Sequence, residues 1–482
     1  MKVCDSALYR IYESAKKFPE RFAYRNSESE YTYEDFLAVC ERIAGFLKGS
    51  ASPVVVYGER CADMLCVMLG CYIAGRAYVP VEKGTPRARI ENIILQTNAE
   101  TVINCCEEEI SFESCGVYRV CDTEESENPP FSADFEAFDG ERTVYIIFTS
   151  GSTGNPKGVP INERNLASFV RWAGKLYSDE KYRGINILGT ASYSFDLSVA
   201  DIYLSLCFGN TLVSLRGDQK GSTVGICETF CEYSIDVAVM TPTFARMCLL
   251  GGMFNAASLE RLKSIFLCGE VLDKKTAGKL LFSFPNLSLV NAYGPTEAAC
   301  AVSAVEITRE HIEDELALPV GKVGECACGV EISDEKLILS GDSVFYGYIG
   351  GLCGGHFVRN GIHCYDTGDL GFIKNGLIYC IGRCDGQIKF RGYRIELSEI
   401  ESVLSGLCGV VSCAVVAKRA SDGAVKGIRA YVCTESDDIM PEKLEALLLA
   451  VLPHYMIPKI VILDELPINR NGKIDRKKLS EM

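Results

Sequence analysis

The chain has 482 residues, of which 48% are hydrophobic and 23% charged, the composition of an ordinary soluble globular protein. Its formal net charge of −15 argues against nucleic acid as a partner. No apolar run has the length of a membrane span, and the start of the chain quickly becomes charged. We therefore expect no secretory signal, no membrane insertion and a cytoplasmic protein.

The N-terminal part of the chain alternates short apolar runs with helical patterns. Residues 53–57 and 77–80 are predicted strands on either side of a helix over 60–74. The alternation continues through predicted strands at residues 145–148, 185–188, 210–215, 237–240 and 264–267. Alternation of this kind predicts a mainly parallel sheet covered by helices.

The C-terminal part has a different pattern. From about Leu337 the strands shorten and glycines multiply, which predicts a small β-rich subdomain. Beyond Gly386 a compact α+β piece is expected, with helices over 397–407 and 441–452 and strands over 410–417 and 427–433. The predicted fold class is α/β: a large lobe of mainly parallel sheets covered by helices plus the β-rich subdomain (residues 1–385), followed by a small mobile α+β lobe (386–482).

Charge also differs between these predicted lobes. Residues 386–482 carry 14 Lys and Arg against 13 Asp and Glu, which leaves 35 against 51 for the rest of the chain. The small lobe is therefore the less repulsive surface for an acidic partner.

One loop carries the strongest functional signal. The predicted strand over 145–148 ends in a run of small hydroxyl and glycine residues that is closed by a lysine. Glycine lets the backbone approach an anion, N–H groups and hydroxyls donate to it, and the lysine adds positive charge, so the loop suits a triphosphate. It is not a Walker A motif, because Lys157 is followed by glycine and not by Ser or Thr. The residues are Thr149, Ser150, Gly151, Ser152, Thr153, Gly154 and Lys157.

Four further segments accompany this loop in a fixed order. They are Asn291-Ala-Tyr-Gly-Pro-Thr-Glu297, Tyr365-Asp-Thr-Gly-Asp369, the stretch from Gly382 to Leu397, and Asn471-Gly-Lys-Ile-Asp-Arg476. On these segments the sequence resembles the adenylate-forming (AMP-binding) enzymes, which include acyl-CoA synthetases and the adenylation domains of peptide synthetases. The resemblance covers nearly the whole chain.

The resemblance implies a reaction that uses ATP and Mg²⁺, in which a substrate carboxylate attacks the α-phosphate and pyrophosphate leaves. Lys473, Thr296 and Glu297 would be catalytic, Glu297 would hold the metal, and the small lobe would rotate about a hinge at Asp385. The implied nucleotide-binding residues are the loop residues above together with Asn291, Ala292, Tyr293, Gly294, Pro295, Thr296, Asp369, Cys380, Arg383 and Lys473.

Asp196 points to the class of acid that is activated. A carboxylate beside a buried pocket is costly unless it meets a cation, and in amino-acid-activating members the matching residue binds the substrate ammonium group. The alternative is that Asp196 only caps the helix that begins near Ser198. The implied substrate-binding residues are Asp196, Leu197, Cys268, Gly294, Cys300 and Lys473.

The rest of the expected pocket is uncharged and small. Leu197, Met240 and Phe266 are expected to fill space, which leaves room for a side chain about the size of alanine. Segments 194–199, 241–245 and 266–271 are similar to those of D-alanine–D-alanyl carrier protein ligases. That resemblance implies transfer of the amino acid to the phosphopantetheine thiol of an acyl carrier protein acting in trans.

Several alternatives remain open because the chain departs from the ligase pattern at Cys300, Cys380 and Asp366. A stand-alone peptide-synthetase-type enzyme for L-alanine, cysteine, serine or glycine is one. An acyl-CoA synthetase is disfavoured by Asp196. A non-catalytic nucleotide binder is disfavoured because Lys473, Glu297 and Asp369 are all present.

Overall fold

The computed structural model describes residues 2–124, 128–135, 139–151, 155–215, 222–352, 354–384, 386–419, 425–436, 439–468 and 474–482. Its contacts divide the chain into two compact units. The larger unit contains Met1–Lys83, Ile94–Ile147 and Val159–Gly382. The smaller one joins Arg383–Met482 to Gly84–Ile93 and Phe148–Gly158, two segments from the predicted large lobe. The predicted hinge residue, Asp385, lies outside the described residues.

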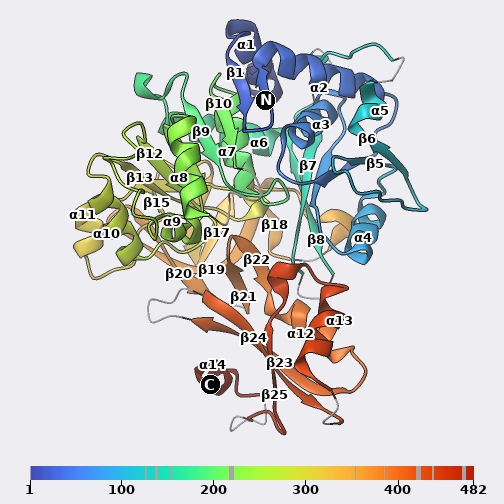
Figure 1. Ribbon diagram of the computed structural model, residues 1–482. Helices are drawn as coiled ribbons and strands as arrows, with labels where there is room; N and C mark the ends of the chain where they lie inside the picture. Colours follow the sequence, from blue (N-terminus) through green and yellow to red (C-terminus); the bar gives the residue numbers. More distant parts are fainter. Residues whose placement is uncertain are drawn as a thin grey trace. The chain divides into compact units, whose positions relative to one another are not determined.

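The central sheet of the larger unit has the strand order β14-β13-β12-β11-β9-β10-β1-β2 (Figure 1). Pairing is parallel from β13 through to β1, while β14 and β2 are antiparallel at the two edges. The strands are β1 (Phe22–Arg25), β2 (Glu30–Thr32), β9 (Asn186–Gly189), β10 (Thr211–Ser214), β11 (Val237–Met240), β12 (Ser264–Leu267), β13 (Ser288–Tyr293) and β14 (Ser303–Glu306).

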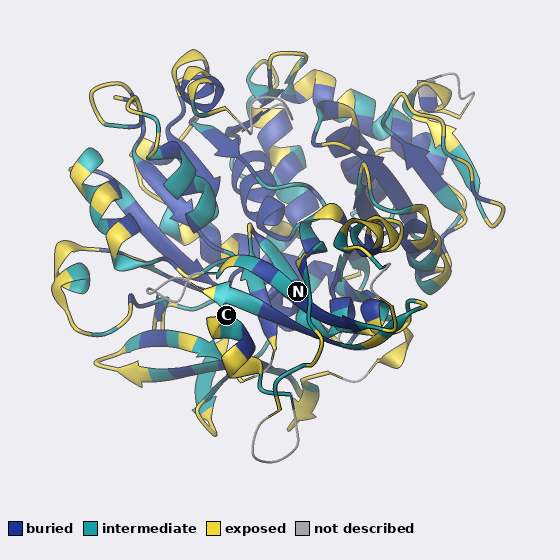
Figure 2. Ribbon diagram, turned by 60° about the horizontal axis from the view of Figure 1, so that its bottom comes forward, coloured by how far each residue is buried: buried dark blue, intermediate teal, exposed yellow. Residues whose placement is uncertain are grey.

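Helices cover both faces of this sheet, and the alternation of side chains along its strands shows why. Val239 of β11 and Phe266 of β12 join one core, whereas Met240 and Leu267 join another. The first core contains residues of α6 (Glu163–Leu176) and α7 (Leu197–Leu206), and the second contains residues of α8 (Thr223–Glu232), α9 (Pro242–Cys248) and α10 (Lys274–Ser283). Figure 2 shows the strands buried and the exposed residues on the outer helices and loops. Because both faces are buried, these strands are continuous apolar runs.

A second sheet follows the order β6-β5-β3-β4-β7-β8. It consists of β3 (Val54–Gly58), β4 (Tyr78–Glu82), β5 (Thr101–Asn104), β6 (Gly116–Arg119), β7 (Thr143–Thr149) and β8 (Lys157–Asn162), and α3 (Ala62–Ile73) connects β3 to β4. β3 lies between β4 and β5 and is parallel to both. The remaining helices of this region are α1 (Ala7–Lys17), α2 (Tyr33–Leu47), α4 (Arg87–Thr97) and α5 (Val120–Glu124). The predicted parallel architecture is confirmed.

The predicted β-rich subdomain is also present. Its sheet has the order β15-β20-β19-β17-β16, with β18 paired to β19, and its described pairs are antiparallel. The strands are β15 (Gly321–Lys322), β16 (Gly329–Ser333), β17 (Lys336–Ser340), β18 (His356–Arg359), β19 (Ile362–Lys374) and β20 (Leu377–Arg383). The short α11 (Arg309–Glu313) precedes this sheet in the chain.

The smaller unit has its own core, as its predicted α+β class requires. The hairpin of β21 (Gln387–Phe390) and β22 (Tyr393–Glu396) precedes α12 (Leu397–Ser405), and β23 (Val410–Arg419), β24 (Val425–Thr434) and β25 (Lys459–Ile462) form a sheet in that order. Ile400, Leu404, Val432 and Leu448 are buried together between the helices and these strands. The last two helices are α13 (Pro441–Leu449) and α14 (Arg476–Glu481). Among the described residues, no helix combines the length and apolarity needed to cross a membrane.

Candidate active site

Asp196 stands at the start of α7, at the carboxyl end of the sheet. Its side chain makes no capping hydrogen bond to that helix. Instead, its Oδ2 accepts a hydrogen bond of 2.5 Å from the Thr296 hydroxyl, 100 residues away in the chain. Asp196 is buried, as is the neighbouring Leu197. The simple capping interpretation therefore does not account for this carboxylate, which lies against a second predicted site residue.

The predicted segment from Asn291 to Glu297 leaves the end of β13 and turns back sharply. Asn291, Ala292 and Tyr293 are the last residues of that strand, and Thr296 and Glu297 form a short 3-10 turn. Gly294 is required there, because a Cβ on it would lie 2.5 Å from the Cα of Ala301. Ala299 and Cys300 then both adopt positive φ, 57° and 80°. Non-glycine residues rarely adopt positive φ because it strains the backbone. Two in succession indicate local strain, which often occurs at functional sites.

Glu297 is held by a tyrosine that the sequence did not single out. Tyr348 donates a hydrogen bond of 2.6 Å from its hydroxyl to Glu297 Oε1. The backbone supports the same contact, because Phe345 N–H donates to the carbonyl of Glu297 at 2.9 Å. Glu297 is only 1% exposed. Its carboxylate thus has a fixed orientation, which suits a group that is to meet a cation.

Asp369 and Tyr293 form a third hydroxyl–carboxylate pair. The Tyr293 hydroxyl donates to Asp369 Oδ2 at 2.6 Å, and the Asp369 N–H donates to the Thr367 hydroxyl at 3.0 Å. Burial, reinforced by the charge of Asp369, raises the pKa of Tyr293 well above its ordinary value, so the phenol remains a hydrogen-bond donor. A carboxylate has about four lone-pair sites, so Asp369 retains acceptor capacity for a second hydroxyl ligand.

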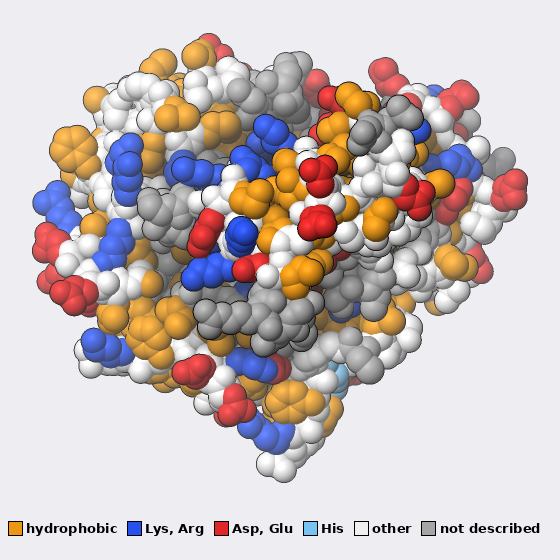
Figure 3. Space-filling view, turned by 90° about the horizontal axis from the view of Figure 1, so that it is seen from below, with side chains coloured by type: hydrophobic (Ala, Val, Ile, Leu, Met, Phe, Trp, Pro, Cys, Tyr) orange, Lys and Arg blue, Asp and Glu red, His pale blue; other side chains and the backbone are white. Residues whose placement is uncertain are grey.

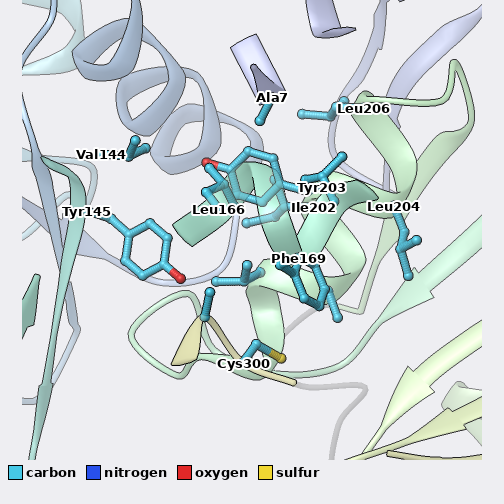
Figure 4. Packing of buried hydrophobic residues seen from close by; sticks show 14 of the residues in the cluster. Ala7, Val144, Tyr145, Leu166, Phe169, Ile202, Tyr203, Leu204, Leu206 and Cys300 are labelled. Carbon is cyan, nitrogen blue, oxygen red and sulfur yellow. The ribbon is translucent and has the colours of Figure 1, made fainter. Parts of the chain in front are cut away.

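Two cysteines lie together near the start of α7. The Cys268 thiol follows β12 and lies 4.0 Å from the carbonyl oxygen of Cys300. The hydrogen bond that the Cys300 thiol shares with Cys268, together with burial, raises the pKa of Cys300 well above its usual value. Figure 4 shows Cys300 in the same core as Tyr145 and Phe169. The Cys300 sulfur therefore acts as a neutral, small apolar group. Met240, which was expected in the pocket, packs instead in the core on the other face of the sheet.

The phosphate loop belongs to the smaller unit, and its described part is engaged there by groups near the start of α12. Ser150 Oγ donates to the Arg394 carbonyl at 2.8 Å and accepts from the Glu396 N–H at 2.9 Å. The Gly151 N–H donates to Glu399 Oε2 at 3.1 Å. Glu399 is fully buried and pairs with Arg89 at 2.8 Å. The Glu399 carboxylate therefore accepts a hydrogen bond from the Gly151 N–H, a group that we expected the loop to donate to a phosphate.

The other predicted residues are placed as follows. Thr149 ends β7, and Lys157 begins β8. Pro295 precedes the 3-10 turn, Cys380 lies on β20, and Arg383 is the last residue of that strand, in the smaller unit. Ser152, Thr153, Gly154, Asp385 and Lys473 lie outside the described residues.

Comparison with known proteins identifies the family. The model of the AMP-binding enzyme family matches residues 11–349, and the model of its C-terminal domain matches residues 399–473. The chain belongs to the AMP-binding enzyme family. This confirms the identification made from the motifs.

Curated relatives of this AMP-binding enzyme match it from end to end. The D-alanine–D-alanyl carrier protein ligase of Lactococcus lactis is 34% identical, with 98% of each chain covered. The ligases of that name from Staphylococcus epidermidis (96% of each chain) and Bacillus velezensis (100% of this chain and 99% of the relative) are both 36% identical to it.

Solved structures show the same fold. The Vibrio cholerae adenylation domain AlmE, determined with glycyl-adenosine-5'-phosphate, has a TM-score of 0.86 at 22% identity and covers 98% of this chain and 97% of its own. The o-succinylbenzoate CoA synthetase of Bacillus subtilis has a TM-score of 0.84 at 19% identity, with 98% of each chain covered. The predicted fold class is thus confirmed.

Sequence reasoning missed two tyrosines of this AMP-binding enzyme. Tyr348 lies in a segment that was interpreted only as glycine-rich, and nothing in its local sequence signals Glu297, 51 residues earlier. Tyr145 was interpreted only as a strand residue, yet its buried hydroxyl has no hydrogen-bond partner among the described residues. Its ring stacks on Tyr78 with centroids 5.6 Å apart. Only the tertiary structure reveals these two hydroxyls.

Proposed function

We propose that this enzyme uses ATP and D-alanine to form D-alanyl-adenylate and pyrophosphate, and then transfers the D-alanyl group to the phosphopantetheine thiol of a carrier protein in trans. The observation that carries the proposal is Asp196, a buried carboxylate that accepts a hydrogen bond from Thr296, at the start of the turn that leads to Cys300, with Cys268 4.0 Å from the Cys300 carbonyl. The ligases that match the chain end to end support D-alanine as the substrate. We place the reaction in the cytoplasm, because that compartment supplies ATP.

The first half-reaction needs positioning more than covalent chemistry. A carboxylate oxygen of D-alanine bonds to the α-phosphorus of ATP while the bond from that phosphorus to the bridging oxygen breaks, and pyrophosphate leaves with the bond electrons. Asp196 would hold the substrate ammonium group, and Thr296 would reach the α-phosphate. Tyr293 would lie against adenine, and Asp369 would accept the ribose hydroxyls. Such positioning contributes much of the rate in reactions of this kind.

In the second half-reaction, the sulfur of the carrier protein displaces AMP from the D-alanyl group. The carrier thiol loses its proton, its sulfur attacks the carbonyl carbon of the adenylate, and AMP leaves as the C–O bond breaks. We propose that Lys473 serves the first half-reaction, and that rotation about Asp385 withdraws it before the second. Such rotations are a common way for one enzyme to perform two reactions.

Glu297 fits the role proposed for it toward Mg²⁺. Magnesium prefers oxygen ligands and is commonly bound by one or two carboxylates together with substrate phosphates. Among the described residues, no group of three or more His, Cys, Asp or Glu is arranged to hold a metal by itself. The Glu297 carboxylate, fixed by Tyr348, fits an ion that arrives with the nucleotide. When bound, the ion would neutralise charge on the phosphates.

Amino-acid-dependent ATP–pyrophosphate exchange tests the proposal. The panel contains D-alanine, L-alanine, glycine, serine, cysteine and a short fatty acid. We expect exchange with D-alanine to exceed that with every other acid. Preference for another amino acid would replace D-alanine and keep adenylation, whereas exchange with the fatty acid alone would contradict the role of Asp196.

A Lys473→Ala variant separates the two half-reactions. It should lose pyrophosphate exchange and still transfer D-alanine from preformed adenylate to the carrier. An Arg476→Ala variant is the control for the loss of a positive charge nearby in the sequence. Loss of both half-reactions in Lys473→Ala would contradict the proposed rotation.

A further inference from the structure

One short segment of the smaller unit binds the described part of the phosphate loop. The Ser150 hydroxyl donates to the Arg394 carbonyl at 2.8 Å and accepts from the Glu396 N–H at 2.9 Å. The Gly151 N–H donates to Glu399 Oε2 at 3.1 Å. These three partners lie at the end of β22 and the start of α12. The segment thus engages two residues that we predicted to bind phosphate.

Glu399 is a charged residue that the fold has removed from water. It is fully buried, whereas the acidic side chains on the face shown in Figure 3 lie at the surface beside basic ones. Its Oε1 accepts from the guanidinium of Arg89, on α4, at 2.8 Å, and Arg89 is buried too. A buried ion pair is weak evidence for stability, because desolvation offsets much of the attraction between its charges. Stability alone therefore does not explain a carboxylate against this loop.

Without nucleotide, the segment satisfies groups of the loop that water does not reach. Ser150 and Gly151 are both buried, and a buried donor without an acceptor destabilises a fold. Glu399 gives the Gly151 N–H an anionic oxygen, the kind of acceptor that a phosphate would give it. Arg89 balances the charge of that oxygen. The carboxylate therefore replaces a phosphate in charge and in hydrogen bonding.

The same donors cannot serve this segment and a nucleotide at once. A backbone N–H has one proton, and a hydroxyl has one proton to donate. Gly151 gives its proton to Glu399, and Ser150 gives its proton to the Arg394 carbonyl. A phosphate beside them would also bring negative charge close to the Glu399 carboxylate, and like charges repel. Binding of phosphate to Ser150 and Gly151 therefore requires the segment to leave them.

We propose that Glu399 competes with the phosphates of ATP for the phosphate loop, so that either the nucleotide or the start of α12 holds Ser150 and Gly151. The inference rests on the proposed function, in which the lobe that carries Glu399 rotates about Asp385 between the half-reactions. ATP binding releases the loop from α12. Recapture of the loop after pyrophosphate leaves keeps pyrophosphate from returning before the thiol attacks. Glu399 is a positioning residue, because it acts through the loop.

Hydrogen exchange at single residues of the wild type, followed by mass spectrometry, tests the competition with ATP and Mg²⁺ as the only added ligands. The Glu396 N–H loses its acceptor when Ser150 turns to phosphate, whereas the Gly151 N–H gains a new acceptor for the one it loses. ATP should therefore speed hydrogen exchange at Glu396 roughly tenfold and leave Gly151 protected. Unchanged or slower exchange at Glu396, in samples saturated with ATP by equilibrium dialysis, would overturn the inference.

Two variants weaken the contact by different amounts. In Glu399→Gln the amide oxygen still accepts from Gly151, but the hydrogen bond is no longer charge-assisted. Arg89→Met/Glu399→Leu removes the acceptor and both charges, a replacement that often leaves a protein as stable as before. In pyrophosphate exchange, the KM for ATP should fall in both variants, roughly tenfold in the double one, while kcat stays within about twofold. The pyrophosphate concentration that halves transfer to the carrier should fall with it.

Glu401→Gln is the matched control, because it removes the same charge from the same helix. The Glu401 carboxylate accepts from the Val415 N–H at 2.6 Å and pairs with Arg476, so its loss should leave the KM for ATP unchanged. If Glu399 served only to hold α12 against Arg89, its variants would unfold at a lower temperature with the KM for ATP unchanged. That result would also overturn the inference.

The two experiments separate this inference from the proposed function. Absence of amino-acid-dependent pyrophosphate exchange in the wild type would count against the proposed function. Hydrogen exchange at Glu396 needs only bound ATP, so it would still decide whether Glu399 and the nucleotide compete for the loop.

Discussion

Two aspartates five residues apart on α7 show how the same side chain is put to different uses. Asp201, in the middle of the helix, is fully buried and pairs with Arg60 at 2.8 Å. Asp196, at its start, is buried too, but it accepts its hydrogen bond from the neutral Thr296 hydroxyl. The partner of Asp201 is a charged guanidinium, whereas Thr296 is a neutral hydroxyl from a second predicted site residue. The first arrangement suits a structural role, and the second suits a role in the candidate site.

The neighbourhood of each aspartate supports this contrast. Arg60 also donates to the Ser214 hydroxyl at 3.0 Å and to the Ala191 carbonyl at 2.6 Å, so hydrogen bonds to a strand and a loop fix its guanidinium in place. Gly189 leaves the room for the pair, because a Cβ there would lie 2.1 Å from Arg60 Nη2. Asp196, by contrast, lies beside the strained loop that carries Glu297 and Cys300. The middle of α7 thus carries an aspartate of the core, and its start carries one of the candidate site.

The largest effect is expected when Asp201 loses its cation. Arg60→Met would leave a buried carboxylate without its guanidinium and should lower the free energy of unfolding by about 3–5 kcal/mol. Denaturant unfolding followed by circular dichroism measures the loss. The double variant Arg60→Met/Asp201→Leu should recover most of it, since both charges are then gone. Equal instability of the single and double variants would contradict the structural role of this ion pair.

Asp196→Asn should do the opposite: activity falls while stability holds. The asparagine oxygen can still accept the Thr296 hydrogen bond, but it cannot neutralise an ammonium group. Loss of a charge partner at a buried contact costs about 2–5 kcal/mol, so kcat/KM for D-alanine should fall roughly 30-fold to several thousand-fold. Pyrophosphate exchange measures this fall. The unfolding midpoint should stay at or above that of the wild type, because a buried charge is removed.

The Asp196→Asn variant also distinguishes the two interpretations of Asp196 made from the sequence, a substrate-binding residue and a helix cap. If Asp196 served only the start of α7, Asp196→Asn would be nearly neutral in exchange, because asparagine is an equally good helix cap. Near-wild-type kcat/KM for D-alanine would therefore remove the main support for an amino-acid substrate.

These cases show which parts of the structure follow from sequence. β11 and β12 occupy the predicted residues because short apolar runs between polar breaks leave few alternatives. Helix ends were less accurate: α12 ends at Ser405, before Gly406, and α13 at Leu449, short of Pro453. Motifs identified Asp196 and Thr296 separately. No local pattern predicts that they touch, or that Glu399 reaches Gly151, because such contacts join residues 100 and 248 positions apart.

Tyr348→Phe extends the comparison to a third carboxylate, Glu297, which accepts a hydrogen bond from a phenol. It removes the hydroxyl that fixes Glu297 and keeps the aromatic packing against Phe345. Residues that orient a metal ligand typically contribute 10- to 100-fold in metal affinity or activity. We expect the Mg²⁺ concentration for half-maximal exchange to rise by roughly that factor, with activity partly restored at high Mg²⁺. Tyr365→Phe, which removes the 3.3 Å contact between the Tyr365 and Tyr348 hydroxyls and keeps the Tyr348 hydroxyl itself, is the control. Equal Mg²⁺ dependence in both variants would contradict the assignment.

The smallest effect concerns Glu163, a buried carboxylate outside the candidate site, for which the raising effect of burial on the pKa outweighs the lowering effect of the Arg142 charge. It accepts hydrogen bonds from the Tyr72 hydroxyl and the Ala7 N–H, and burial raises its pKa above 4.5. The native state therefore binds the proton more tightly than the unfolded state, so this group's contribution is fully present below pH 4.5 and is lost as pH rises through the native pKa. Glu163→Gln should remove that dependence. Its stability relative to the wild type should increase from pH 4.5 upward and then level off, as measured by urea unfolding across pH. A constant difference would show that Glu163 keeps the same pKa on folding.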